Sequence, residues 1–404
     1  MRDSKKVKMF LYFLFCLIVA LEYVVLGAAT NDRQPSCKIC KCNGTTVDCE
    51  GVKLDNVPKD FPPNITELSL ARCGLVELKD NELGMLYKHL RRLDIRHNKI
   101  AALKNVTFAG LNELQYIDMG GNKYRADEVD PFVFSLLPNI TEIIVRGYGD
   151  TRNHDIDRHV PRAWFDTFKG LENSTIERIT FDAISESPVI LKKEDFVYLN
   201  KSPVKYLSLY NIRLVDIDFE FLGNLIHLEE VDLSMNNLQM NIKYLNAITQ
   251  LFKLKKLRNI SLNDNSQNWN EKNERELLPK FIAEFPLPVP QSMEEINFAR
   301  SILVRGPKRY LSYGFKIQRE NAIRKVDVSG FKLMQRLGPV HGAVHVKELY
   351  AEDIGCEMYP STFSCEYGAL ESIEIMNIAH NFINMTQNNV KQLGCSPTVA
   401  DSNT

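Results

Sequence analysis

The chain has 404 residues, of which 50 are lysine or arginine and 51 are aspartate or glutamate, so its formal charge at pH 7 is −1. This balance excludes an overall field that would attract nucleic acid or an anionic membrane, and either partner would need a local patch. We therefore do not expect nucleic acid as a partner. The length is too great for one small hydrophobic core, whereas it is natural for an array of stacked repeats.

The first 29 residues carry the pattern of a secretory signal peptide. Basic residues precede an apolar run from Met9 to Leu21, and small residues follow at 27–29. This arrangement predicts cleavage near Ala29 and a secreted, extracellular chain, or one at the cell surface if it is a fragment of a membrane receptor. An uncleaved membrane anchor is the alternative. Glu22 keeps the apolar run short of a comfortable span, and no later stretch approaches the length of a membrane helix.

Four of the nine cysteines form one tight group behind the expected cleavage site, at Cys37, Cys40, Cys42 and Cys49. In an oxidising compartment this spacing indicates a disulfide-stapled N-terminal cap, which we place at residues 37–64. Zinc is the alternative for such a cluster, but no matching histidines accompany it. The spacing alone does not decide which cysteines pair.

Between residues 65 and 395 one phrase recurs about twelve times, and clear copies begin at Leu90, Leu228 and Ile373. It consists of an apolar residue, two variable residues, an apolar-variable-apolar triplet and a preferred asparagine three positions further on. This leucine-rich repeat pattern predicts an α/β solenoid, or horseshoe, in which each repeat supplies a short strand and a return arm that stack on their neighbours. The asparagine amide suits backbone groups at the turn after the strand.

The repeats are irregular in length. The predicted starts are residues 65, 90, 114, 140, 176, 204, 228, 257, 293, 323, 346 and 373, and neighbouring starts lie 23 to 36 residues apart. Tyr148, Ile184, Ile212, Ser301, Phe331 and Ile354 stand where asparagine is expected. We therefore expect an interrupted asparagine ladder and irregular curvature. A polar tail, residues 396–404, follows the last repeat.

Eight Asn-x-Ser/Thr sequons without an intervening proline support secretion. They are Asn43, Asn64, Asn105, Asn139, Asn173, Asn200, Asn259 and Asn384. Asn259 occupies the third position of its repeat, which the strand alternation directs out of the concave face. A glycan there would shield part of that face. Asn64 and Asn139 each lie directly before a repeat start.

Four further cysteines lie in the repeats. Cys73 fills the asparagine position of the first repeat, and we expect a buried thiol there. Cys365 and Cys395 fall at comparable places on adjacent return arms, so a disulfide between them is expected. Cys356 with Cys365 is the competing pair, and it would leave one thiol over.

Catalytic motifs are missing from the sequence. It contains no Gly-x-Ser-x-Gly elbow, no His-Glu-x-x-His pair and no phosphate-binding glycine loop. The eight histidines are scattered, and neither His154 with His159 nor His341 with His345 is placed to hold a metal. We expect neither enzymatic activity nor a metal or cofactor.

Recognition is expected at the third, fifth and seventh positions of the repeats, which point out of the concave face. Arginine and tyrosine suit binding because they bury large contact areas while their polar ends stay satisfied. The ligand-binding candidates at these positions are Arg92, Arg96, Tyr116, Arg146, Arg178, Tyr206 and Tyr210, with Asp94, Asp118 and Asp232 beside them. The plainer explanation is that any strand face exposed to water carries such residues.

Two insertions and one basic stretch offer rival surfaces. The insertion at residues 147–173 adds Trp164 to the ligand-binding candidates, although this ring can also cover the return-arm core. The insertion at 265–291 contains Trp269, and long loops on a rigid scaffold often carry function. The stretch from Arg305 to Lys325 is basic enough to meet an anionic ligand, and a solvated loop is its plainer interpretation.

The signal peptide, the cysteine cap, the lead-in Val57-Pro58-x4-Pro63-Asn64 and the irregular repeats together resemble the ectodomain of Toll-like receptors. The return-arm phrase from Thr167 to Leu171 adds to the resemblance, which covers nearly the whole mature chain. It implies a receptor of innate immunity that recognises a microbial or endogenous ligand as a homo- or heterodimer. It also implies that Cys37 pairs with Cys42 and Cys40 with Cys49, although the first gap is one residue shorter than in the family.

The sequence departs from that family after its last repeat. Up to Thr404 it shows no second cysteine cap, membrane helix or signalling domain. We therefore expect either a fragment of a longer receptor or a secreted short form. The alternative is a structural, adhesion or matrix leucine-rich repeat protein that binds other extracellular proteins. Such a protein shares the cap and signal peptide but normally has more uniform repeats.

Overall fold

The computed structural model describes residues 36–147, 160–184, 187–218, 222–238, 251–265, 285–286, 289–301, 313–316, 322–330, 337–341, 345–353, 357–358, 372–380 and 382–383. Predictions on the signal peptide, on Cys365 with Cys395, on Asn384, on Trp269 and on the tail fall outside these residues. Most of the basic stretch after Arg305 does so too. Within the described part, no helix combines the length and apolar character that a membrane crossing requires.

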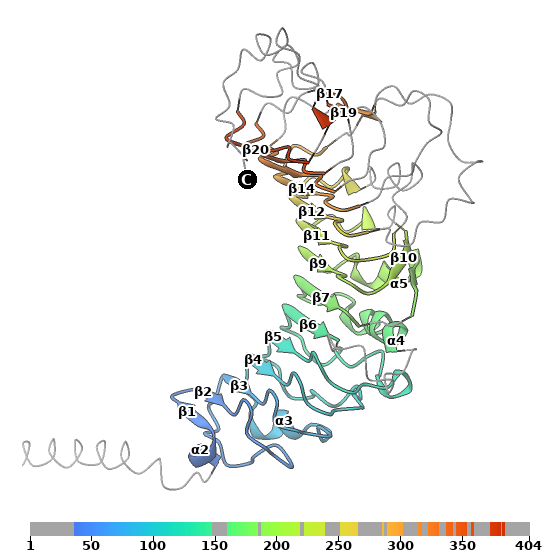
Figure 1. The fold of residues 1–404 in the computed structure, drawn as a ribbon. Coiled ribbons are helices and arrows are strands. Elements are labelled where there is room, and N and C mark those ends of the chain that lie inside the picture. The colour runs from blue at the N-terminus through green and yellow to red at the C-terminus, as the bar shows by residue number, and fades with distance from the viewer. Residues whose placement is uncertain are drawn as a thin grey trace, which may run out of the picture.

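A sheet of 14 strands lines the inner side of an arc in the described part of the chain (Figure 1). Strands β1 (Lys41–Asn43) and β2 (Thr46–Asp48) form an antiparallel hairpin, and β2 continues into the repeats by pairing in parallel with β3. The repeat strands are β3 (Glu67–Ser69), β4 (Arg92–Asp94), β5 (Tyr116–Asp118), β6 (Glu142–Arg146), β7 (Arg178–Asp182), β9 (Tyr206–Ser208), β11 (Glu230–Asp232), β12 (Asn259–Ser261), β14 (Glu295–Asn297), β16 (Lys325–Asp327), β18 (Glu348–Tyr350) and β20 (Ile375–Asn377). Each begins two residues after a predicted repeat start.

The register of the sheet follows directly from the repeat. Leu68, Leu93 and Ile117 stand in line across β3, β4 and β5, and all three are buried. Their flanking strand residues point the other way, as strand alternation requires. A second buried line follows the strands at positions such as Ile95 and Leu233. The predicted solenoid with a disulfide-stapled cap is therefore confirmed.

One residue per coil turns the chain after its strand in the left-handed conformation. It stands seven residues after the predicted start in eleven of the twelve coils, for example at His97 (φ 56°), Met235 (φ 59°) and Gly121 (φ 65°). The exception is the fourth coil, whose strand β6 continues to Arg146. The left-handed region costs a non-glycine residue roughly 1–2 kcal/mol. The coil-to-coil hydrogen bonds around each turn offset this cost.

The asparagine ladder supplies many of those bonds. Asn98 donates from Nδ2 to the carbonyl of Leu70 (2.8 Å) in the previous coil and to that of Ile95 (2.9 Å) in its own coil. Its Oδ1 accepts from the amide of Leu75 (3.1 Å). Asn122, Asn236 and Asn265 repeat this arrangement.

Positions without asparagine differ in how they replace it. Ile184 and Ile212 are buried apolar side chains, so the ladder is interrupted there as expected. At Ser301 the expected interruption is only partial, because its hydroxyl donates to the carbonyl of Leu262 in the previous coil. Cys73 is a buried free thiol, as predicted, and its Sγ lies 3.1 Å from the carbonyl oxygen of Cys49.

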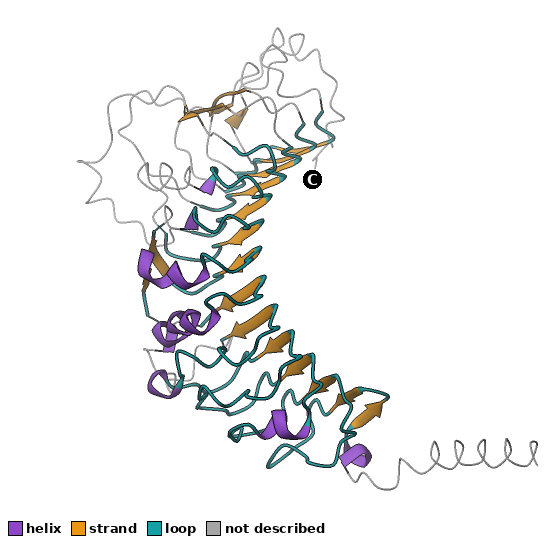
Figure 2. Cartoon of the chain, turned by 180° about the vertical axis from the view of Figure 1, so that it is seen from behind, coloured by secondary structure: helices purple, strands orange, loops and turns teal. Residues whose placement is uncertain are grey.

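Short helices and small sheets form the outer side of the arc (Figure 2). They are α3 (Glu82–Leu86), η1 (Ala126–Glu128), α4 (Val160–Asp166), η2 (Thr167–Leu171), α5 (Lys193–Phe196), η3 (Val197–Leu199), the pair β8 (Val189–Leu191) and β10 (Leu214–Ile217), the triplet β13 (Phe285–Pro286), β15 (Tyr313–Lys316) and β17 (Leu337–His341), and the pair β19 (Glu357–Met358) and β21 (Phe382–Ile383). The return arms thus differ from coil to coil while the inner strands stay alike.

The N-terminal cap closes the apolar end of the first repeat. It consists of α2 (Ser36–Ile39) and the β1–β2 hairpin, held by the disulfides Cys37–Cys42 and Cys40–Cys49. This is the pairing implied by the Toll-like resemblance, and it is confirmed. Val47, Phe61 and Cys49 are buried beneath it. The main-chain amide of Ser36 donates to Asp60 at 3.0 Å and ties the start of the cap to its end.

Candidate functional site on the concave face

Three rows of side chains make up what we call the concave face. They are the first residue of each inner strand, the third residue, and the residue two positions further on. The rows run across thirteen strands, from β2 to β20. In β4, for example, Arg92 and Asp94 flank the buried Leu93, and Arg96 continues the alternation. A rigid sheet therefore presents these side chains to solvent at a fixed spacing of about 4.8 Å per strand.

Four of the predicted ligand-binding residues form two stacked pairs in the first row. The guanidinium of Arg92 lies 3.8 Å from the centre of the Tyr116 ring, and that of Arg178 lies 4.2 Å from the centre of the Tyr206 ring. Such cation–π contacts are worth about 0.5–1 kcal/mol at exposed sites. Each pair joins neighbouring strands, so the sheet register brings together residues that are 24 or 28 positions apart.

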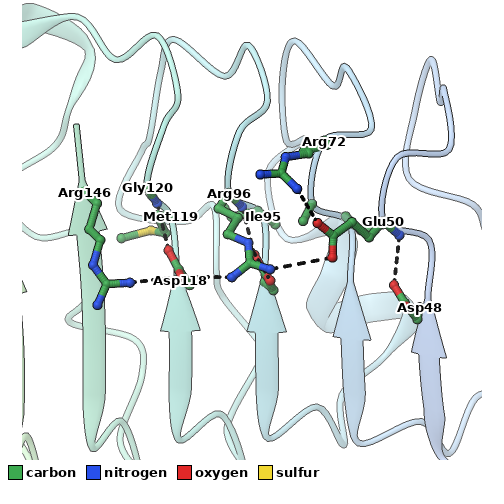
Figure 3. A network of polar contacts seen from close by, with 12 residues as sticks. Asp48, Glu50, Arg72, Ile95, Arg96, Asp118, Met119, Gly120 and Arg146 are labelled. Carbon is green, nitrogen blue, oxygen red and sulfur yellow. Dashed lines mark hydrogen bonds and ion pairs between the residues drawn. The ribbon is translucent and has the colours of Figure 1, made fainter. Parts of the chain in front are cut away.

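Two other predicted residues, Arg96 and Arg146, belong to an ion-pair network across β2 to β6 (Figure 3). Arg96 lies 3.6 Å from Glu50 and 4.0 Å from Asp118, and Arg146 lies 4.0 Å from the same Asp118 oxygen. Arg72 lies at the end of this network, 2.8 Å from Glu50. Asp118, expected as a displayed residue of this face, is only 2% exposed because the sheet and the two arginines enclose it.

The network extends to two further carboxylates. Arg96 lies 3.3 Å from Asp94, and Arg146 lies 3.5 Å from Asp182. Burial raises the pKa of Asp94, as do the charges of Asp118 and Glu50, while Arg96 opposes them. Burial likewise raises the pKa of Asp182, against the Ser208 hydroxyl and Arg146. For both carboxylates, burial is therefore the main cause of the raised pKa, and the neighbouring arginine offsets only part of it.

A hollow of about 380 Å³ opens in the concave face over β2 to β5. Its lining residues are Thr46, Val47, Asp48, Glu50, Glu67, Leu68, Ser69, Arg92, Leu93, Asp94, Arg96 and Tyr116. Three predicted residues, Arg92, Arg96 and Tyr116, thus share one depression. Arg146, Arg178, Tyr206 and Tyr210 lie further along the same face. Tyr210, directly after β9, is 36% exposed.

Trp164 is not part of any recognition surface, contrary to its place among the predicted ligand-binding residues. It lies in α4 and is 1% exposed. Its ring contacts Tyr124 edge-on at 5.1 Å and Phe181 at 5.9 Å. The described part of the 147–173 insertion uses its aromatic residues as core, because the longer return arm must fill the space between neighbouring coils.

The described sequons lie at different places on the solenoid. Asn259 is the first residue of β12, between Glu230 and Glu295 of the neighbouring strands, so it stands on the concave face as expected. Asn64 and Asn139 are exposed in the turns that lead into β3 and β6. Asn43, Asn105, Asn173 and Asn200 are exposed as well. Glycosylation of each remains a prediction.

Sequence reasoning named Asp94, Asp118 and Asp232 on the face but passed over its glutamates. It chose arginine and tyrosine for their binding chemistry, yet Glu67, Glu142 and Glu230 occupy the same first-row positions. The repeat register, already readable in the sequence, carries the signal that identifies them. Among the described residues, no group of three His, Cys, Asp or Glu side chains is arranged to hold a metal ion.

Comparison with known proteins agrees with this architecture. The Leucine rich repeat family matches residues 63–124 and 88–147. Decorin of Homo sapiens is 24% identical in an alignment of length 204, and the match covers 36% of this chain and 56% of decorin. Epiphycan of Mus musculus is 29% identical over 122 residues, or 30% of this chain and 29% of epiphycan. The chain thus spans about half of decorin's length and under a third of epiphycan's.

A solved structure described as a TLR13-ssRNA13 complex aligns with a TM-score of 0.52 at 17% identity, over 84% of this chain and 47% of that one. At this identity the similarity concerns the fold alone. The chain thus has the leucine-rich repeat fold, and the curated proteins to which it is similar are extracellular.

Proposed function

We propose that this chain is an extracellular leucine-rich repeat protein of the structural or matrix type, which binds other extracellular proteins through its concave face. The observation that carries this proposal is the face itself. A rigid sheet carries mostly polar and aromatic side chains in three rows over thirteen strands, and all residues of the first row are at least partly exposed, whereas several of the other two rows, such as Asp118 and Ser208, are buried. Large, pre-organised surfaces of this kind bind proteins without paying for loop ordering.

The relatives support the same proposal, because decorin and epiphycan are extracellular matrix proteins. The leader at residues 1–29 and the sequons agree with secretion. In this proposal the cap at 37–64 and the repeats at 65–395 form one recognition unit, followed by the tail at 396–404.

A Toll-like receptor ectodomain is the second candidate. Its support is the irregular repeat length and the return-arm phrase at η2, Thr167–Leu171. The curated relatives favour the matrix interpretation over this one. Reading the transcript beyond Thr404 tests it: a second cysteine cap, a membrane helix and a signalling domain would establish a receptor, whereas a stop codon would contradict a membrane receptor.

A glycan placed on the concave face tests the first proposal. Tyr206→Asn creates the sequon Asn-Leu-Ser at the start of β9, because Leu207 and Ser208 follow. The secreted chain is screened against an array of purified extracellular proteins, including a second copy of itself. For a protein that binds, the added glycan should abolish binding, since its bulk covers the middle of the face.

Two controls accompany this variant. Tyr206→Gln removes the same ring without creating a sequon, so it separates the glycan from the loss of the side chain. Leu136→Asn with Pro138→Thr creates a sequon on a return arm, where Leu136 is 42% exposed. Binding should survive the return-arm glycan, and Tyr206→Gln should lose much less binding than Tyr206→Asn, because it removes one ring and adds no bulk. Partners that all tolerate the glycan at position 206 would contradict the proposal.

A further inference from the structure

The concave face is strongly acidic although the whole chain is nearly neutral. Its three rows hold thirteen acidic and five basic side chains, a formal charge of −8, compared with −1 for the whole chain. The acidic residues are Asp48, Glu50, Glu67, Asp94, Asp118, Glu142, Asp182, Glu230, Asp232, Glu295, Asp327, Glu348 and Glu352. The register of the sheet collects on one curved surface charges that are scattered along the sequence.

The basic residues of the face are already engaged. Arg96 and Arg146 belong to the network described above, and Arg92 stacks on Tyr116. Arg178 lies 3.7 Å from Glu142, and Lys325 lies 3.3 Å from Glu295. All five basic side chains of the face therefore already interact with its own carboxylates or aromatic rings.

Several carboxylates, by contrast, take part in no ion pair among the described residues, although Arg258 acts on Glu230 from a longer distance. Within the part of the chain that the structure describes, no ion pair reaches Glu67, Glu230 or Asp232. Glu67 lines the hollow over β2 to β5. Glu230 and Asp232 stand beside Tyr206 and Ser208 near the middle of the face. The face therefore keeps negative charge outside any ion pair at two places, at Glu67 in the hollow and at Glu230 with Asp232 near its middle.

At some acidic positions of the face the carboxylate also has a structural role, because one of its oxygens accepts a hydrogen bond in the turn after the strand. This role requires an oxygen acceptor but not a negative charge. Asp232 accepts the amide of Ser234 at 2.9 Å, and Asp327 accepts that of Ser329 at 2.9 Å. In β14 and β20 an asparagine oxygen accepts the same turn bond: Asn297 accepts the amide of Ala299 and Asn377 that of Ala379, each at 3.1 Å. Because an amide oxygen is sufficient for this bond, the turn does not require a carboxylate.

We propose that the concave face docks a basic, lysine- or arginine-rich segment of a protein partner, with a basic side chain entering the hollow beside Glu67. This inference rests on the proposed function, because it names the chemistry of the partner that the face binds. Charges lining a concave surface focus their field and raise the local concentration of the opposite charge. A polyanionic ligand meets the opposite situation, since thirteen acidic residues repel it and the five basic ones are occupied.

The test uses the secreted full chain and three probes: a fluorescent oligolysine, an oligoglutamate of equal length, and heparin. Fluorescence anisotropy measures binding at low salt and near physiological salt, where the Debye length is about 8 Å. The variant Glu67→Gln, Glu230→Gln, Asp232→Asn removes three charges and keeps the turn bond at position 232. Its matched control, Glu77→Gln, Glu194→Gln, Asp55→Asn, removes three charges from exposed residues of the cap and return arms.

Oligolysine should bind the wild-type chain and weaken as salt rises, and the concave variant should lose roughly tenfold in affinity. The control should bind like the wild type. An equal loss in both variants would overturn the inference, because binding would then follow net charge rather than the face. Preference for oligoglutamate or heparin, or no oligolysine binding, would overturn it too.

The two proposals fail in distinguishable ways. A protein partner that the glycan at position 206 blocks, but that the neutralised variant binds unchanged, leaves the concave face as the binding surface and refutes its basic partner. A partner that ignores the glycan refutes the proposed function, whatever the oligolysine result.

Discussion

Replacing Asn236 with alanine tests the hydrogen-bonded ladder that holds neighbouring coils together. Asn236 is 1% exposed. Its Nδ2 donates to the carbonyls of Leu209 (2.7 Å) and Leu233 (2.9 Å). Its Oδ1 accepts from the amides of Ile212 and Leu214, each at 3.0 Å. A weaker bond from Nδ2 reaches the carbonyl of Ser234 (3.2 Å), so that one side chain satisfies five backbone groups in two coils.

The expected loss follows from these bonds. A buried polar group left without a partner costs about 1–3 kcal/mol, and orphaned amides are tolerated less well than orphaned carbonyls. If the two amides carry most of the cost, Asn236→Ala lowers the free energy of unfolding by about 4 kcal/mol. The neighbouring change Asn237→Ala is the control, because only its backbone amide is bonded, to the carbonyl of Leu214.

Urea unfolding followed by circular dichroism measures this difference. The control should stay within about 0.5 kcal/mol of the wild type, as surface substitutions do. In a solenoid a weakened interface can also split unfolding into two transitions, since each coil contacts only its neighbours. A loss below about 1 kcal/mol for Asn236→Ala, or equal losses in both variants, would refute the argument.

Gly84→Ala should destabilise the fold by about 3 kcal/mol in the same assay, because the new Cβ would lie 2.0 Å from the carbonyl oxygen of Ala109, whereas Met85→Ala, 71% exposed, should change little. Trp164→Ala should cost about 3–5 kcal/mol through the cavity it leaves, and a near-neutral result would contradict its core role. Burial raises the pKa of the Cys73 thiol from 9.0 to about 11, so the folded state holds this proton more tightly. Stability should therefore fall by up to about 3 kcal/mol as pH rises from 9 to 11, and Cys73→Ala should lack this part of the pH dependence. Enzymatic removal of N-glycans should lower the apparent mass of the secreted chain on a gel, and an unchanged mass would contradict the secretion prediction.

The inner strands were predictable because the apolar positions that specify each strand lie within a single repeat. The apolar positions that become Leu68, Leu93 and Ile117 recur with the same local spacing, and every coil buries them against the coil before and after it. Such contacts depend on a local pattern and on the neighbouring repeat, not on a distant part of the chain. The cap pairing, by contrast, followed from family resemblance, since spacing alone left it open.

The binding surface was only partly predictable. The repeat positions correctly placed Arg92, Tyr116, Arg178 and Tyr206 on one face, yet not their stacking in pairs. The spacing between coils varies, so no constant offset in the sequence pairs an arginine with its partner. Trp164 shows the same limit, because the sequence around an aromatic residue in an insertion does not distinguish a side chain on the surface from one buried in the core.

By itself the sequence determined the solenoid, the positions of its strands and the direction in which alternate side chains point, because these follow from short periodic patterns and strand geometry. Only the tertiary structure decided which charges neutralise one another, that Asp118 is enclosed between two arginines, and where carboxylates remain unpaired. These properties depend on distances between side chains of different coils. Stacking the coils at one fixed register sets those distances, and the same stacking turns a nearly neutral chain into one with an acidic concave face.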